Sequence, residues 1–215
     1  MAVAIEGEVR RILGVTRSDG RTRAQQIVRA VLAAWRDWME CPDRGKYSRW
    51  VRTRACMVFE RLADRLPENL GGDEGVQFIF DDETIRICFD DELLVRCKKA
   101  NELGFGQNNA TQACLQFCEC DLELPGLPGL QKVEILYSVN ATGTAIESIV
   151  VQARDGDMRL WAYPLSLSDE GSGTSDNLTP FPTQPPPSYT PDDFVNPRPR
   201  HERELESDSD DNDDE

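Results

Sequence analysis

Hydrophobic side chains in the first 70 residues recur three and four positions apart, the period of an α-helix that packs one face against a core. A short amphipathic stretch at residues 4–13 is separated by the turn sequence at 16–21 from a longer one at 22–40. Thr22 can cap this longer helix, and Pro42 should end it, because proline disfavours helix in the residue before it. Its apolar positions are Ile27, Val28, Val31, Leu32, Trp35, Trp38 and Met39.

A third helix is predicted from about Tyr47 to Leu66. Proline has no backbone N–H and its ring crowds the preceding turn, so Pro67 is expected to end this helix. Residues 1–70 are therefore interpreted as a helical subregion. The apolar residues in phase along the third helix are Trp50, Val51, Val58, Leu62 and Leu66.

From residue 71 onward the hydrophobic period changes to two, which indicates β-strands. A helix through Cys114 and Cys118, capped by Asn108 or Asn109, interrupts the strands. Helices followed by strands indicate an α+β fold, with the N-terminal helices packed on a mainly antiparallel sheet. Residues 71–167 then form the sheet-rich subregion of the same domain. The predicted strands are 76–80, a hairpin of 84–89 and 93–98, and a meander of 133–139, 145–152 and 158–163.

The composition changes at residue 168. Residues 168–215 contain eight of the 13 prolines of the chain and end in the acidic run 206–215. Such a segment cannot bury enough apolar surface to offset its ordering entropy, so a disordered, proline-rich acidic tail is expected. The tail has a net charge of −11 out of −15 for the chain, so the first 167 residues have only −4.

The remaining charge is divided along the sequence. Residues 1–70 have a net charge of +5 and residues 71–167 a net charge of −9. An acidic protein is not expected to bind nucleic acid or an anionic membrane surface generically. The seven cysteines have no framework spacing, and the chain has no long apolar run. We therefore expect a cytoplasmic protein with reduced thiols and without a membrane partner.

Three cysteines have the spacing closest to that of a metal site: Cys114, Cys118 and Cys120. Cys114 and Cys118 would share one helix face, and Cys88 and Cys97 could complete the site only if the fold brings them close. Two other interpretations of these cysteines stay open. They could include a redox-active or regulatory thiol, or they could be buried and act as small hydrophobic residues. No cofactor is predicted.

A second group of polar residues is similar to a metal-dependent PD-(D/E)xK nuclease arrangement. Carboxylates of Glu60, Asp90 and Asp91 would hold Mg²⁺, and Lys98 would polarise the attacking water. The acidic residue expected two positions before the lysine is replaced by Arg96. Aspartates are also common in hairpin turns for conformational reasons. The only histidine, His201, lies in the tail, so histidine-based acid–base or nucleophilic catalysis is not expected. Apart from this nuclease-like group, no catalytic residue is predicted.

The third helix is rich in arginine. These side chains could contact phosphates or an acidic partner, or could form a solvated face or pair with the acidic sheet region. The acidic tail could also fold back on them and compete with an anionic ligand, an effect that salt should weaken. The arginines are Arg49, Arg52, Arg54, Arg61 and Arg65.

Four short motifs between residues 93 and 161 are similar to those of a group of small uncharacterised bacterial proteins. They are Leu93–Lys99, Ala110–Gln112, Leu124–Pro128 and a hairpin at 137–144. The group is often encoded beside XRE/ImmA/IrrE-type regulator-peptidases, which resemble toxin–antitoxin or mobile-element regulators. The resemblance implies a protein partner in a bacterial operon and carries no catalytic motif.

These patterns favour a non-enzymatic interaction or regulatory protein that acts through a protein partner, in a defence, toxin–antitoxin or mobile-element operon. Two alternatives stay open. One is a nucleic-acid-directed protein, either a divergent nuclease or a phosphate-binding protein that uses the arginine-rich helix. The other is a nucleic-acid mimic that uses the acidic tail to block a basic site.

Overall fold

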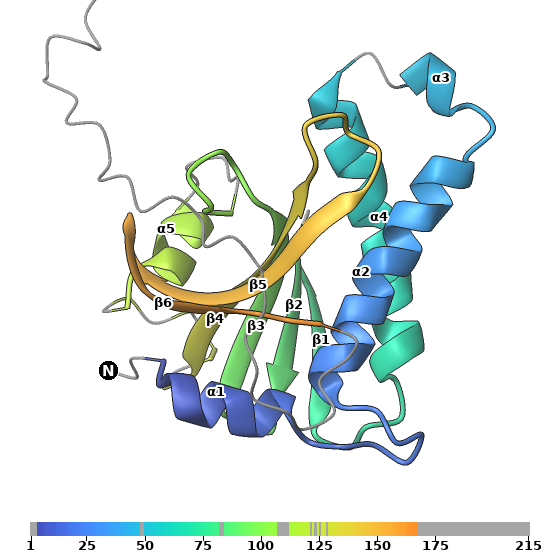
Figure 1. Cartoon of the computed structure of the whole chain (residues 1–215). Helices are drawn as coiled ribbons and strands as arrows, with labels where there is room; N and C mark the ends of the chain where they lie inside the picture. The colour runs from blue at the N-terminus through green and yellow to red at the C-terminus, as the bar shows by residue number, and fades with distance from the viewer. Residues whose placement is uncertain are drawn as a thin grey trace, which may run out of the picture. The chain divides into compact units, whose positions relative to one another are not determined.

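The computed structural model describes residues 4–47, 50–81, 84–106, 112–120, 122, 124, 126–127 and 129–166 (Figure 1). The chain divides into two units, residues 1–181 and 182–215, and every described residue belongs to the first unit. The predicted disordered tail at 168–215 lies outside the described residues, as do Arg49, the expected cap at 108–109 and Ala110.

The described elements follow the predicted α+β order (Figure 1). The N-terminal helices are α1 (Glu6–Leu13), α2 (Arg23–Glu40), α3 (Arg44–Tyr47) and α4 (Val51–Leu70). The first meander is β1 (Val76–Asp81), β2 (Thr84–Phe89) and β3 (Leu93–Lys99). After α5 (Gln112–Cys118), the second meander is β4 (Gln131–Val139), β5 (Ile146–Asp155) and β6 (Met158–Pro164).

Helix α2 begins and ends where its sequence signals predict. The Thr22 hydroxyl accepts a hydrogen bond from the Gln25 N–H at 3.2 Å, and the Gln25 side chain accepts one from the Thr22 N–H at 2.9 Å. This reciprocal pair is a capping box, which satisfies backbone donors that the first turn leaves open. The helix ends at Glu40, and the N–H of the next residue, Cys41, donates to the Trp38 carbonyl at 3.2 Å.

The predicted end of the third helix at Pro67 is wrong, because α4 continues to Leu70 with Pro67 inside its last turn. Leu70 is fully buried, so an additional turn of helix places another apolar side chain in the core. The Gly71 N–H donates to the Pro67 carbonyl at 2.7 Å. The Arg17 guanidinium donates to the carbonyls of Asn69, in the last turn, and of Gly71, just after it, so this end of the helix gains donors from outside the helix.

Replacing Pro67 with alanine should raise the free energy of unfolding by about 1 kcal/mol. Proline inside a helix is about 3 kcal/mol less favourable than alanine, and the greater freedom of the unfolded alanine variant offsets part of the gain. Urea denaturation of both proteins measures the difference. Pro42 lies just after α2, so Pro42→Ala is the matched control and should give no gain. An unchanged or lower midpoint for Pro67→Ala would contradict the account.

Among the described residues, the sheet has six strands in the order β1-β2-β3-β4-β5-β6. Every neighbouring pair is antiparallel except β3 and β4, which are parallel, so the prediction of a mainly antiparallel sheet is confirmed. The parallel pair cannot be joined by a tight turn. Residues 100–130 therefore form a crossover connection that contains α5, and this connection decides what lies on the second face of the sheet.

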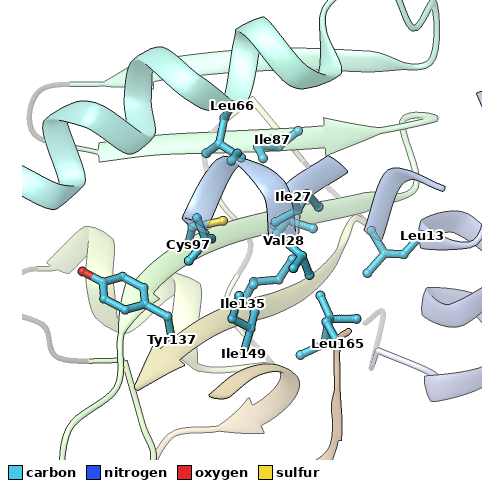
Figure 2. Close-up of a cluster of buried hydrophobic side chains, with 14 of the residues drawn as sticks. Leu13, Ile27, Val28, Leu66, Ile87, Cys97, Ile135, Tyr137, Ile149 and Leu165 are labelled. Atoms are coloured by element: carbon cyan, nitrogen blue, oxygen red, sulfur yellow. The ribbon is translucent and has the colours of Figure 1, made fainter. Parts of the chain in front are cut away.

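Alternate residues of the strands build two separate hydrophobic clusters. The larger one packs one sheet face against α1, α2 and α4, and Figure 2 shows Ile27 and Leu66 of the helices meeting Ile87 and Ile135 of the strands. Cys97 is buried in this cluster, and burial raises the pKa of its thiol to about 12. The smaller cluster lies on the other face under α5 and contains Cys88, Leu94, Phe117, Cys118 and Leu124.

No helix among the described residues is long and apolar enough to span a membrane.

Candidate functional site

Four polar residues form a row across the sheet on the side that faces α5. Strand pairing places Arg86 opposite Arg96, Arg96 opposite Glu134, and Glu134 opposite Gln152. Directly opposed residues in neighbouring strands have side chains close enough to interact. All four are buried, and Glu134 and Gln152 are each only 1% exposed. The second sheet face therefore buries charged strand residues, whereas the first face buries mainly apolar ones.

Glu134 is the centre of this row. Arg96 Nη2 donates to its Oε1 at 2.8 Å, Gln152 Nε2 donates to its Oε2 at 3.2 Å, and Arg154 Nε lies 3.4 Å from Oε2. Burial disfavours the charged carboxylate, but the guanidinium groups of Arg154 and Arg96 outweigh it and hold the pKa of Glu134 below its usual range. A Cβ at Gly106 would lie 2.7 Å from Oε1, so only glycine fits beside the carboxylate.

The sulfur of Cys118 lies between the same two arginines. Arg96 Nη2 donates to Cys118 Sγ at 3.6 Å, and Arg154 Nη2 also donates to it. Burial raises the pKa of the Cys118 thiol, and the charges of Arg154 and Arg96 act in the opposite direction. Aromatic rings cover the guanidinium groups, with Arg96 4.3 Å from the centre of the Phe117 ring. The arginines are thus held by a carboxylate, a sulfur and aromatic rings at once.

The predicted cysteine group is brought only partly together. The sulfurs of Cys114 and Cys118 are 3.8 Å apart on one face of α5, whereas the Cys120 sulfur contacts the Arg154 carbonyl at 3.5 Å. Cys88 lies in the smaller hydrophobic cluster and Cys97 in the larger one, on the opposite face of the sheet. Within the described part of the chain, no group of three or more metal-binding side chains could hold a metal ion.

The nuclease-like residues are not brought together. Asp90 and Asp91 form the turn before β3, whereas Lys98 lies near the far end of that strand, about 20 Å away at ~3.3 Å per residue. Asp90 is bound by Arg23 at 2.6 Å. Lys98 lies over the Phe59 ring at 5.2 Å, and burial lowers its pKa. Glu60 is exposed on α4.

Two of the four arginines of α4, Arg61 and Arg65, have acidic neighbours. Arg65 binds Asp37 of α2 at 2.8 Å and Glu68 at 2.8 Å. The hydrogen bond from Arg65 lowers the pKa of Asp37. Arg61 lies 3.8 Å from Asp64. These acidic partners belong to the helices. The alternative in which the arginines pair with the acidic sheet region is therefore not seen for Arg61 and Arg65.

Arg54 and Arg52 lie in the first turns of α4. Arg54 reaches the Gly143 carbonyl at 3.5 Å and faces the Trp35 ring at 5.9 Å. Arg52 is exposed, as is Trp50, the residue immediately before the helix. Only this short part of the arginine-rich helix presents its charge to solvent without a neighbouring carboxylate among the described side chains.

A surface hollow of about 510 Å³ lies beside the edge of the sheet. Phe80 of β1 contributes an aromatic ring that is 64% exposed. Strand β1 is at the end of the sheet, so within the described part of the chain no further strand pairs with its outer row of backbone groups. The lining residues are Asp37 of α2, Arg61, Ala63, Asp64, Arg65, Pro67 and Glu68 of α4, and Phe80.

Sequence reasoning anticipated two residues of this hollow, Arg61 and Arg65, as partner-binding candidates, and missed Phe80 and Asp37. The alternation at 76–80 predicted the strand but could not show that it forms an edge. Comparisons with protein-family models, with curated proteins and with solved structures find no match to this chain.

Proposed function

We propose that this protein is a non-enzymatic interaction protein, which binds an extended segment of a protein partner along β1 and in the adjoining hollow. The observation that carries the proposal is a terminal strand, unpaired on its outer side among the described residues, beside a hollow that has both an aromatic ring and charged groups. Edge strands accept an additional strand through main-chain hydrogen bonds, and neighbouring pockets for alternate side chains supply specificity.

The hollow favours a particular kind of segment. The exposed ring of Phe80, together with Ala63 and Pro67, forms an apolar surface for one partner side chain. Arg61 is half exposed, and its pairing with Asp64 is loose at 3.8 Å, so its guanidinium can turn toward an incoming carboxylate. The partner segment should therefore be extended, with an apolar residue flanked by an acidic one.

The resemblance of residues 93–161 to proteins encoded beside regulator-peptidases supports a regulatory setting. Under the proposal, the partner is encoded in the same bacterial operon, of a defence, toxin–antitoxin or mobile-element kind. A cytoplasmic setting belongs to the same proposal and rests on the seven cysteines, which are all thiols.

Phe80→Lys should weaken partner binding about tenfold or more, which corresponds to ~1.4 kcal/mol, because an anchoring aromatic side chain is replaced by a charge. The partner is first captured with the immobilised full-length protein, identified by mass spectrometry and purified. Its dissociation constant is then measured by calorimetry for the wild type and the variant.

Trp50→Lys is the matched control, since Trp50 is as exposed as Phe80 but precedes α4 at its other end. This control should bind like the wild type. Hydrogen exchange on the purified complex should show new protection of the β1 amides. Equal binding by Phe80→Lys, or protection confined to other elements, would contradict the proposal.

A further inference from the structure

The dithiol of α5 has a geometry that the binding proposal does not use. Cys114 and Cys118 are one helical turn apart, and their sulfurs lie 3.8 Å from each other. Cys114 is half-buried, whereas Cys118 is 5% exposed. Cys114 is therefore partly accessible to solvent, and the sulfur of the buried Cys118 lies within contact distance of the Cys114 sulfur.

We propose that Cys114 and Cys118 are an oxidant-sensitive modification site, in which a hydroperoxide oxidises Cys114 and Cys118 then closes a reversible disulfide. The site is independent of the β1 edge, so each proposal can fail without the other.

Arg96 and Arg154 favour Cys118 as the thiol that attacks the oxidised Cys114 and closes the disulfide. Guanidinium groups beside a cysteine stabilise its thiolate, which is the nucleophile in disulfide formation. Arg96 and Arg154 both donate to Cys118 Sγ, and Glu134 supplies only one negative charge between them. Burial keeps the resting thiol protonated, while the two guanidiniums stabilise negative charge on the sulfur as its proton leaves.

The chemistry proceeds in two balanced steps. The Cys114 thiolate attacks one oxygen of the hydroperoxide, an S–O bond forms, the O–O bond breaks, and hydroxide or alkoxide leaves. The sulfur of Cys114 is oxidised by two electrons to a sulfenic acid, and the peroxide is reduced. The Cys118 thiolate then attacks the Cys114 sulfur, the S–S bond forms, and the hydroxyl group leaves as water with the proton of Cys118.

Closing this bond must change the end of α5. Residues four apart in a helix have Cβ atoms about 5–6 Å apart, whereas a disulfide brings them to about 3.5–4.5 Å. Cys118 is the last residue of α5, so its backbone can shift inward by loosening a single turn. Its sulfur then moves away from Arg96 and Arg154. The end of α5 therefore packs less closely over the buried row of Arg86, Arg96, Glu134 and Gln152.

To test this, the folded full-length protein is treated with hydrogen peroxide. It is then unfolded in the presence of an alkylating reagent, which blocks the remaining thiols, and digested with trypsin. Residues 100–132 form a single tryptic peptide that contains Cys114, Cys118 and Cys120, since no lysine or arginine lies between Ala100 and Lys132. The expected product is this peptide with two hydrogens fewer and with Cys120 alone alkylated. Dithiothreitol should restore alkylation of all three thiols.

Two variants decide whether the pair is specific. Cys114→Ser, at a half-buried position, should abolish the product without unfolding the protein. Cys56→Ser, at an exposed position on α4, should leave it unchanged. A bridge that involves Cys120 or Cys88, or a product that forms equally well in Cys114→Ser, overturns the proposal. So does a product that forms only after the protein is unfolded.

The role of the guanidinium groups has its own readout. The rate of disulfide formation should rise with pH as the Cys118 thiol loses its proton. Arg154→Gln should move this rise to higher pH, and Arg154→Lys should move it part of the way back toward the wild-type profile. A merely structural role for Arg154 would lower the yield without moving the pH profile, and that result would remove the arginines from the proposal.

Discussion

Replacing Glu134 with glutamine should lower the free energy of unfolding by about 3–5 kcal/mol, the range found when one member of a buried ion pair is removed. The substitution keeps the shape of the side chain but leaves Arg96 and Arg154 buried beside a neutral group. Water cannot replace the lost charge, because Glu134 is 1% exposed. Urea denaturation measured by circular dichroism gives the difference.

Glu147→Gln is the matched control, because Glu147 is exposed on the neighbouring strand β5. Surface substitutions of this kind usually change stability by less than about 0.5 kcal/mol. If both variants lose the same small amount, the buried row does not contribute to stability in the way its geometry indicates.

The pH dependence of stability provides an independent check on Glu134. Its folded-state pKa lies below the unfolded value of about 4.3, so its contribution is complete above that pH and is lost as the pH falls through the folded-state value. The stability of the wild type should therefore fall more steeply in acid than that of Glu134→Gln. Other carboxylates act equally in both proteins, so the difference between the two curves isolates this residue. Parallel curves would contradict the assignment.

Arg23→Met should be the second strongly destabilising substitution, at about 3 kcal/mol. Arg23 is 3% exposed and donates to both oxygens of Asp73 and of Asp90, at 2.6–3.0 Å. It also lies 3.4 Å from the Ile12 carbonyl. Methionine keeps the aliphatic length and removes the charge, which leaves two carboxylates facing each other. Asp90 is partly exposed, so water recovers part of the loss.

A nearby surface ion pair is the natural comparison for Arg23. Arg11 of α1 binds Glu92 at 2.7 Å, beside the same β2–β3 turn, but both side chains are more than half exposed. Exposed pairs contribute about 0–1 kcal/mol, so Arg11→Met should be nearly neutral. Equal losses in Arg11→Met and Arg23→Met, measured by the same denaturation, would show that burial of the pair does not matter.

Local signals in the sequence were enough to predict most of the elements. The Thr22–Gln25 spacing and the period of α2 depend on contacts within a few residues, and so do the alternation and turn residues that predicted the β2–β3 hairpin. Pro67 misled the prediction because its local effect competes with burial of Leu70, which is a tertiary contact.

The buried row could not be predicted from spacing. Polar residues that alternate along a strand normally indicate a face in contact with water. Taken one strand at a time, Arg96 and Glu134 would therefore be expected on an exposed face. They are 38 positions apart, and only the parallel pairing of β3 with β4 places them opposite each other. The same holds for the hollow, which Phe80 of β1 and Asp37 of α2 line together with residues of α4, although the three elements are far apart in sequence.

The parallel pairing of β3 with β4 also divides the sheet into two halves that can form separately during folding. Each half is a meander of three strands whose partners are close in sequence, so each can form with little loss of chain entropy. Joining them requires residues 100–130 to close a long loop first, and such non-local contacts slow folding. The charged row spans this seam, with Arg96 on one side and Glu134 on the other. Its ion pair can therefore form only when the halves dock, so we expect the seam to be the last part of the sheet to acquire its native contacts.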